Sequence, residues 1–182
     1  MRFQRICSFL LFVSACAIAQ FHPSNLRKPE PPVGTVREYV RQDYDGARLS
    51  PESWSRIKEL VTWKDNPDWQ NVKIISRYEV LSVKEGLRSA TVNVRYDVLG
   101  KFESGIGFMA EPASEEAEFR LREIANTWKI DDLDPQTGPH VSKARVVQWL
   151  QGLLPKEKDA AHRVAIESAL KQLQSARQPA KN

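Results

Sequence analysis

The stretch RSATVNVRYDVL, residues 88–99, decides the fold of this chain. Alanine, valine or tyrosine occupies positions 90, 92, 94, 96 and 98, and threonine, asparagine, arginine or aspartate stands between them. Successive side chains of a β-strand point to opposite faces of the sheet. The alternation therefore predicts a strand with one buried face and one polar face.

Further strand-like sequence lies on both sides of this stretch. Residues 72–83 are rich in β-branched side chains, and Lys84-Glu85-Gly86 provides a hairpin turn between the two strands. Two later segments, 116–124 and 127–133, are also predicted strands. The segment 100–114 contains glycines and a proline and is predicted to be a loop.

Helical sequence precedes and follows the strands. Residues 33–44 place apolar side chains at three- and four-residue steps, which predicts an amphipathic helix. A second helix is expected from Ser50, because serine is a good N-cap and Pro51 suits the first helical position. Residues 141–154 and 156–178, separated by a proline, are predicted to form a helical hairpin.

The segment NTWKIDDL, residues 126–133, resembles the last strand of the nuclear transport factor two-like superfamily, which includes SnoaL-like polyketide cyclases and ketosteroid isomerases. With the first helix, the resemblance covers a domain at residues 33–134. It implies N-terminal helices packed on a curved antiparallel sheet, a cone with a pocket at its mouth. The predicted fold is therefore α+β, with residues 141–178 as a C-terminal helical extension. A homodimer is a further expectation, since open sheet faces in this superfamily often pair.

Isomerase-type chemistry needs a carboxylate base in an apolar pocket, opposed by a hydrogen-bond donor. Asp43 and Asp97 are the candidate bases, and Tyr39, Tyr44 and Tyr96 the candidate donors. The strand alternation places Tyr96 with the buried valines and Asp97 on the opposite, polar face. Packing tyrosines and solvated acids are the ordinary interpretation of all five residues, and we favour it.

Three tryptophans are predicted to line or rim a pocket. Trp63 and Trp69 flank the chain break at Asn66-Pro67-Asp68, and the family resemblance implies that Trp128 anchors the last strand of the cone. No metal site and no cofactor are predicted, because the three histidines are scattered along the chain without ligand spacing. They are His22, His140 and His162.

The first nineteen residues have the layout of a secretory signal peptide. A short basic start precedes an apolar stretch that closes on Ala17-Ile18-Ala19. Cleavage after Ala19 would give an exported protein, periplasmic or secreted, that begins with a Pro-rich linker at residues 20–32. The mature chain would then contain neither cysteine and no transmembrane segment.

A membrane-anchored lipoprotein is the alternative to a soluble exported protein. Val13-Ser14-Ala15-Cys16 resembles the bacterial lipoprotein box, in which the cysteine carries the lipid. Cleavage before Cys16 would tie the chain to a membrane. The apolar residues that follow Cys16 favour the soluble form.

Charge is uneven along the chain. From Val141 onward there are eight lysines and arginines against three acids. A solvated helix face explains this basic end, and export argues against nucleic acid as a partner. Our first hypothesis is an exported, non-catalytic binding domain for a small apolar ligand or a protein partner.

Two alternatives remain open. One is an enzyme of the isomerase or dehydratase type, with an aspartate base and a tyrosine donor in the cone. The other is an envelope-associated interaction protein whose C-terminal helices hold the partner. The latter predicts an exposed apolar patch from Trp149, Leu150 or Leu154.

Overall fold

Strand β2 (Ser89–Glu103) forms the centre of the sheet and contains most of the alternating stretch at residues 88–99. From Ala90 to Val98 its residues alternate between buried and half-buried, as the sequence predicts. The computed structural model describes residues 31–132 and 138–175. The predicted signal peptide, Cys16 and most of the Pro-rich linker lie outside the described residues.

The sheet is mixed, whereas the sequence predicted a purely antiparallel one. Its strand order is β5-β4-β2-β1-β6, and β3 pairs with β2 off this path. Strand β6 runs parallel to β1, and the other pairs are antiparallel. The strands besides β2 are β1 (Asn71–Glu85), β3 (Gly107–Met109), β4 (Ala113–Ile124), β5 (Thr127–Asp132) and β6 (His140–Ser142), all within the described residues.

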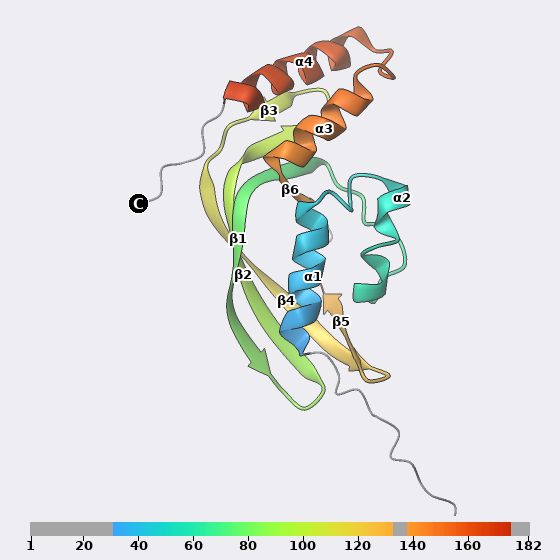
Figure 1. The fold of residues 1–182 in the computed structure, drawn as a ribbon, viewed down its shortest axis with the longest axis vertical. Coiled ribbons are helices and arrows are strands. Elements are labelled where there is room, and N and C mark those ends of the chain that lie inside the picture. Colours follow the sequence, from blue (N-terminus) through green and yellow to red (C-terminus); the bar gives the residue numbers. More distant parts are fainter. Residues whose placement is uncertain (1–30, 133–137, 176–182) are drawn as a thin grey trace, which may run out of the picture.

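The sheet is strongly curled into a half-barrel (Figure 1). Strands β1 and β2 are each 15 residues long, and strands twist progressively along their length. Their pairing also shifts register between Ile74 and Ile75, between Ile75 and Arg77, and between Val80 and Ser82. Such bulges bend a strand and increase its twist. The α+β class and the curved sheet are therefore confirmed.

Helix α1 (Pro32–Tyr44) lies on the concave side of the sheet (Figure 1). It begins one residue before the predicted start, because proline fits the first turn of a helix. Its inward face buries Val36, Tyr39, Val40 and Asp43. The helix therefore carries two of the candidate site residues into the interior.

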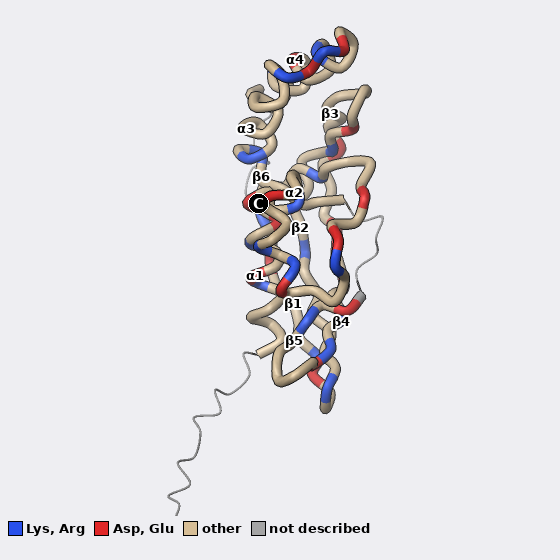
Figure 2. Tube along the Cα trace, turned by 90° about the vertical axis from the view of Figure 1, so that its right-hand side faces the viewer, with Lys and Arg blue, Asp and Glu red and all other residues tan. Residues whose placement is uncertain are grey.

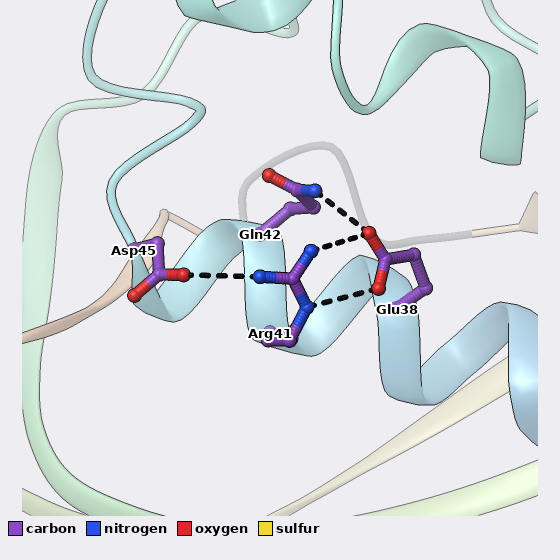
Figure 3. A network of polar contacts seen from close by, with 4 residues as sticks. All are labelled: Glu38, Arg41, Gln42 and Asp45. Atoms are coloured by element: carbon purple, nitrogen blue, oxygen red, sulfur yellow. Dashed lines mark hydrogen bonds and ion pairs between the residues drawn. The ribbon is translucent and has the colours of Figure 1, made fainter.

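The outward face of α1 carries a polar network centred on Arg41 (Figure 3). Arg41 Nη2 lies 2.6 Å from Glu38 Oε1, and Arg41 Nη1 lies 3.4 Å from Asp45 Oδ2. Gln42 Nε2 donates to the same Glu38 oxygen at 2.7 Å. Exposed pairs of this kind contribute at most about 1 kcal/mol, so the network adds little to the stability of the fold.

The expected second helix is shorter than its sequence pattern suggests. Helix α2 (Pro51–Trp54) is capped by Ser50 Oγ as predicted, and a 3₁₀ turn, η1 (Lys58–Leu60), follows it. The Ser55 hydroxyl donates to the Glu52 carbonyl, a local bond that competes with helix propagation. The chain then becomes extended, and Val61 forms a bridge with Ile130 of β5.

The segment 100–114, predicted to be a loop, is largely strand. Strand β2 continues to Glu103, turns, and returns as β3. Gly105 and Gly107 adopt φ angles of 84° and 100°, which glycine allows at a tight turn. Phe102 and Phe108 are buried on either side of that turn. Apolar packing therefore overrides the loop signals of glycine and proline.

The C-terminal part begins with a strand that the sequence did not indicate. Val141, predicted to start a helix, lies in β6 beside β1. Helix α3 (Lys143–Leu153) follows, with Ser142 as its N-cap, and α4 (Ala160–Ser175) packs against it. The last residues of the predicted final helix, 176–178, lie outside the described residues.

The buried side chains form two clusters. The cone core fills the space between α1 and the concave face of the sheet, with Val36, Tyr96, Phe119 and Ile130 among its members. The terminal core joins one end of the sheet to α3 and α4, and includes Leu150. Figure 2 shows acidic and basic residues interspersed along strands and helices rather than gathered on one element.

Candidate functional site

A buried polar cluster lies between α1 and the sheet. It comprises one acid, one arginine, two tyrosines and one histidine from α1, the turn after it, β2 and β6. Three of its members, Tyr39, Asp43 and Tyr96, were candidates from sequence. The full cluster is Tyr39, Asp43, Arg48, Tyr96 and His140, each at most 5% exposed.

Asp43 is the carboxylate of the cluster and stands on the last turn of α1, 2% exposed. Its Oδ2 accepts a hydrogen bond of 2.9 Å from the backbone N–H of His140. Its Oδ1 is buried and accepts no hydrogen bond within the described residues. Burial raises the pKa of Asp43 to about 6, although the Arg48 charge and the His140 N–H both act to lower it.

Tyr39 lies one helical turn before Asp43 and faces the same way. Its ring packs edge-to-face on Phe119, with 5.6 Å between the ring centroids. The Tyr39 hydroxyl is buried and has no hydrogen-bond partner among the residues that the structure describes. Burial is also the main cause that raises the pKa of Tyr39, and the nearby Arg48 charge opposes the shift.

Tyr96 and His140 are stacked on one another. Their ring centroids are 4.1 Å apart and the ring planes differ by 18°. Burial lowers the pKa of His140 to about 3, and the charges of Lys73 and Arg48 add to this effect. Burial raises the pKa of Tyr96, and the charge of Asp43 raises it further. Both rings are therefore neutral at physiological pH.

Arg48 supplies the positive charge of the cluster and is 1% exposed. Its Nε donates to Asn66 Oδ1 at 3.3 Å, and Asn66 Nδ2 donates to the Arg48 carbonyl at 2.9 Å. This pair of bonds joins the turn after α1 to the segment before β1.

The other two catalytic candidates lie elsewhere. Asp97 forms an ion pair with Arg77 on the outer face of the sheet, as the strand alternation predicted for its direction. Tyr44 is half-buried, and its hydroxyl donates to the Ser76 carbonyl at 3.3 Å. Neither residue belongs to the buried polar cluster.

Two cavities border the segment that precedes β1. The larger, about 450 Å³ and here called the Arg48 cavity, is bordered by Arg48, Trp54, Asp65, Asp68 and Trp69, among others. The smaller, about 190 Å³, lies between the end of β2 and the C-terminal helices. We call it the Trp149 cavity. Trp69 lines both cavities.

Aromatic rings meet edge-to-face around the Trp149 cavity. The Trp149 ring centroid lies 6.1 Å from that of Trp69 and 5.7 Å from that of Phe102. Glu157 and His162 add polar groups to the same lining, with Glu157 Oε2 3.8 Å from His162 Nδ1. Apolar walls with a few placed polar groups are typical of small-molecule sites.

The predicted pocket tryptophans separate in the structure. Trp69 lines the two cavities, whereas Trp63 and Trp128 pack in the cone core. Trp63 Nε1 is buried and donates no hydrogen bond to any described residue. Trp149, which the sequence analysis named only as part of an apolar patch, lines the smaller cavity.

The apolar patch expected on the C-terminal helices is not formed by the three residues named for it. Leu150 is fully buried, and Trp149 and Leu154 are half-buried against the terminal core. Among the described residues of α4, Val164 is a large apolar side chain that remains 64% exposed. Of the three residues named for the patch, only the half-buried Trp149 and Leu154 keep any exposed surface, and the interaction hypothesis stays a prediction.

Sequence reasoning missed Arg48 and His140 as members of the buried cluster. An arginine after a helix is ordinarily exposed, and His140 follows a proline in a segment without periodicity. One signal was available for Arg48, because Ala47 and Leu49 flank it with apolar side chains. His140 offered none, since its position depends on a strand pairing with residues far earlier in the chain.

Neither a metal centre nor a membrane-spanning helix is found within the described residues. No group of three or more histidine, cysteine, aspartate or glutamate side chains is placed there to hold a metal ion. None of the described helices combines the length and the apolar character needed to cross a membrane.

Comparison with known proteins gave no match: no family model, no curated protein and no solved structure matches this chain. The resemblance to the nuclear transport factor two-like superfamily therefore stays a prediction.

Proposed function

We propose that this chain is an exported binding domain whose small apolar ligand occupies the Trp149 cavity. The observation that carries the proposal is the meeting of Trp69, Phe102 and Trp149 around a cavity of about 190 Å³. A cavity of about 150 Å³ with apolar walls is enough to bind benzene. The site therefore suits a ligand with one aromatic ring or a group of similar size.

The position of the cavity supports a binding role. Its walls come from the segment before β1, from the end of β2 and from both C-terminal helices. Phe102 and Ile166 are buried there, so the floor is held by the terminal core. A site built on packed elements is largely formed before the ligand arrives, which limits the entropy lost on binding.

The tryptophans provide a direct test with 2-phenylethanol as the probe. In a ¹⁵N-labelled full-length chain, the indole N–H signals of Trp69 and Trp149 are expected to shift and saturate, while those of Trp63 and Trp128 stay in place. Trp149→Phe should weaken binding roughly fivefold, because an edge-to-face aromatic contact contributes about 1 kcal/mol. Trp128→Phe, the matched control in the cone core, should leave the affinity unchanged. Absence of saturable shifts at Trp69 and Trp149 would refute the proposal.

A second function, proton abstraction by an isomerase- or dehydratase-type enzyme, is favoured by a different observation. Asp43 Oδ1 and Tyr39 Oη are both buried and lack hydrogen-bond partners within the described residues. A carboxyl with a pKa near 6 is an effective base at neutral pH. Asp43 would be the base and Tyr39 or Tyr96 the donor to the developing oxyanion.

This second function can be tested with an enolisable ketone. The α-protons of cyclohexanone in D₂O should exchange faster in the presence of the wild-type chain, and Asp43→Asn should abolish the acceleration. Asp97→Asn is the matched control, because Asp97 lies on the outer face of the sheet in an ion pair with Arg77. Equal exchange with and without the protein would exclude this chemistry for simple ketones.

A further inference from the structure

The two cavities share a wall but differ in chemical character. Trp69 lines both, and Asp68, the residue before it in the chain, lines the Arg48 cavity. The lining of the Trp149 cavity includes three aromatic rings and aliphatic side chains, whereas that of the Arg48 cavity includes two carboxylates and two tryptophans. A ligand whose ring occupies the smaller cavity therefore has a polar compartment of about 450 Å³ on the other side of Trp69.

The charges of the Arg48 cavity are not equivalent. One arginine, Arg48, lines this cavity, and its side chain is only 1% exposed. Asp65 and Asp68 are exposed, and neither forms an ion pair with a described residue. The charge that this cavity offers to a ligand is therefore negative.

The Trp149 cavity adds a third carboxylate of the same sign. The Glu157 side chain is 28% exposed, lines the cavity and faces the more exposed His162. Aromatic rings attract cations through the negative potential of their faces. Four aromatic side chains, Trp54, Trp69, Phe102 and Trp149, line the two cavities together with these carboxylates.

We infer that the ligand is an organic cation, an aromatic or apolar group that carries an amine or a quaternary ammonium. The ring enters the Trp149 cavity, and the cationic end lies beyond Trp69 against Asp65 and Asp68. This inference rests on the proposed binding function and adds to it the charge of the ligand. An anionic ligand would meet like charge from three carboxylates.

The test uses three probes with the same phenyl ring and different charge. They are phenethylamine, 2-phenylethanol and 3-phenylpropionate, which are positive, neutral and negative at pH 7. Titration of the full-length chain at low salt should give the tightest binding for phenethylamine, roughly tenfold tighter than for 2-phenylethanol, with 3-phenylpropionate the weakest. Added sodium chloride should weaken the binding of the amine and leave that of the alcohol unchanged.

Substitution of the two aspartates tests whether they cause the preference for the positively charged probe. The double variant Asp65→Asn, Asp68→Asn should lose about fivefold or more of the affinity for phenethylamine and none for 2-phenylethanol. Glu116→Gln is the matched control, because Glu116 pairs with Arg95 on the outer face of the sheet and borders neither cavity.

Three outcomes would contradict the inferred charge of the ligand or the proposed binding function. If the alcohol binds as tightly as the amine, or the double variant weakens both equally, the inferred charge of the ligand is wrong and the binding function stands. If 3-phenylpropionate binds most tightly, the ligand is an anion and the inference is overturned. If none of the three probes binds at millimolar concentration, the proposed binding function fails as well.

Discussion

The Asp43 carboxylate and the backbone N–H of His140 are joined by a hydrogen bond of 2.9 Å that spans 97 positions of the chain. Asp43 lies at the end of α1, and His140 begins β6. The bond therefore connects the helix on the concave side to the strand that leads into the C-terminal helices. It also places an ionisable group of unusual pKa at the centre of the fold.

Substitution Asp43→Asn is expected to stabilise the protein at neutral pH. Burial raises the pKa of Asp43 from 3.8 to about 6, so the folded chain binds a proton more tightly than the unfolded chain. Stability contributed by this group is present at low pH and is lost as pH rises from about 4 to 6. With about 1.4 kcal/mol per pKa unit, the loss reaches at most about 3 kcal/mol.

Urea unfolding at pH 7.5 and pH 4 checks this prediction. Asparagine keeps an acceptor for the His140 N–H without the buried charge, so the variant should be more stable at pH 7.5 and close to the wild type at pH 4. Asp97→Asn should change stability by less than about 1 kcal/mol at either pH, because Asp97 forms a surface ion pair. An Asp43→Asn variant less stable than the wild type at pH 7.5 would show that the buried charge is compensated by its neighbours.

Substitution His140→Phe is expected to reduce the loss of folding stability that the protein suffers as pH falls below 6.5. Burial lowers the pKa of His140 from 6.5 to about 3, so the unfolded chain binds a proton that the folded chain excludes. Stability from this group is fully present above pH 6.5 and is lost as pH falls toward 3. Phenylalanine retains a ring to stack on Tyr96 and does not titrate.

The free energy of unfolding of the His140→Phe variant, relative to that of the wild type, should therefore rise by about 2 kcal/mol when the pH is lowered from 7 to 5. Chemical unfolding at these two pH values measures it. The control His162→Phe changes a side chain that is 47% exposed and should give no such increase. A parallel loss of stability at both pH values would instead indicate that the histidine nitrogens have bonding roles of their own.

The fold could be predicted where the pattern is local. The alternation from Ala90 to Val98 identifies β2, and the helical spacing of Val36, Tyr39 and Val40 identifies α1. Strand β6 has three residues and pairs with β1 about 67 positions earlier, as in Lys73 with His140. No local periodicity can signal a contact of that kind, because it depends on how the curled sheet returns on itself.

Part of the candidate site could also be predicted from local sequence periodicity. Tyr39 and Asp43 are four positions apart on one helix, so their common direction follows from helical geometry. Tyr96 enters the same interior by strand alternation. Their association with Arg48 and His140 is tertiary. The cavity at Trp149 is tertiary too, since its three rings come from separate elements of the chain.

Substitution Gly100→Ala is expected to destabilise the β2–β3 hairpin. A Cβ atom at residue 100 would lie 2.2 Å from the Met109 carbonyl oxygen and 2.8 Å from the Phe108 ring. The backbone would have to move, at a cost of roughly 2 kcal/mol or more. Gly152→Ala in α3 is the matched control, since a Cβ there meets nothing within 4 Å.

Thermal and urea unfolding of both glycine variants measure the difference. Gly152→Ala should raise stability by about 0.5–1 kcal/mol, because alanine is the better helix former. If the Gly100→Ala variant is as stable as the wild type, β3 can be displaced from β2 without a loss of folding stability. In that case the turn at residues 104–106 would not be a firm support for the Trp149 cavity.

Substitution Leu150→Ala tests whether the C-terminal helices are an extension or part of the same folding unit. Leu150 is fully buried in the terminal core, which also contains Val72 and Ile74 of β1 and Val141 of β6. Removal of a buried leucine side chain costs about 2–5 kcal/mol. Because β6 is hydrogen-bonded to the sheet, this loss should be transmitted to the whole domain.

We therefore expect Leu150→Ala to shift a single unfolding transition, with tryptophan fluorescence and far-ultraviolet circular dichroism changing together. Val164→Ala is the control on α4, where the side chain is 64% exposed and truncation should matter by less than about 0.5 kcal/mol. Two separate transitions in the Leu150→Ala variant would instead show that the C-terminal helices unfold on their own. A single transition would mean that the wall of the Trp149 cavity is as stable as the sheet, as a preformed binding site requires.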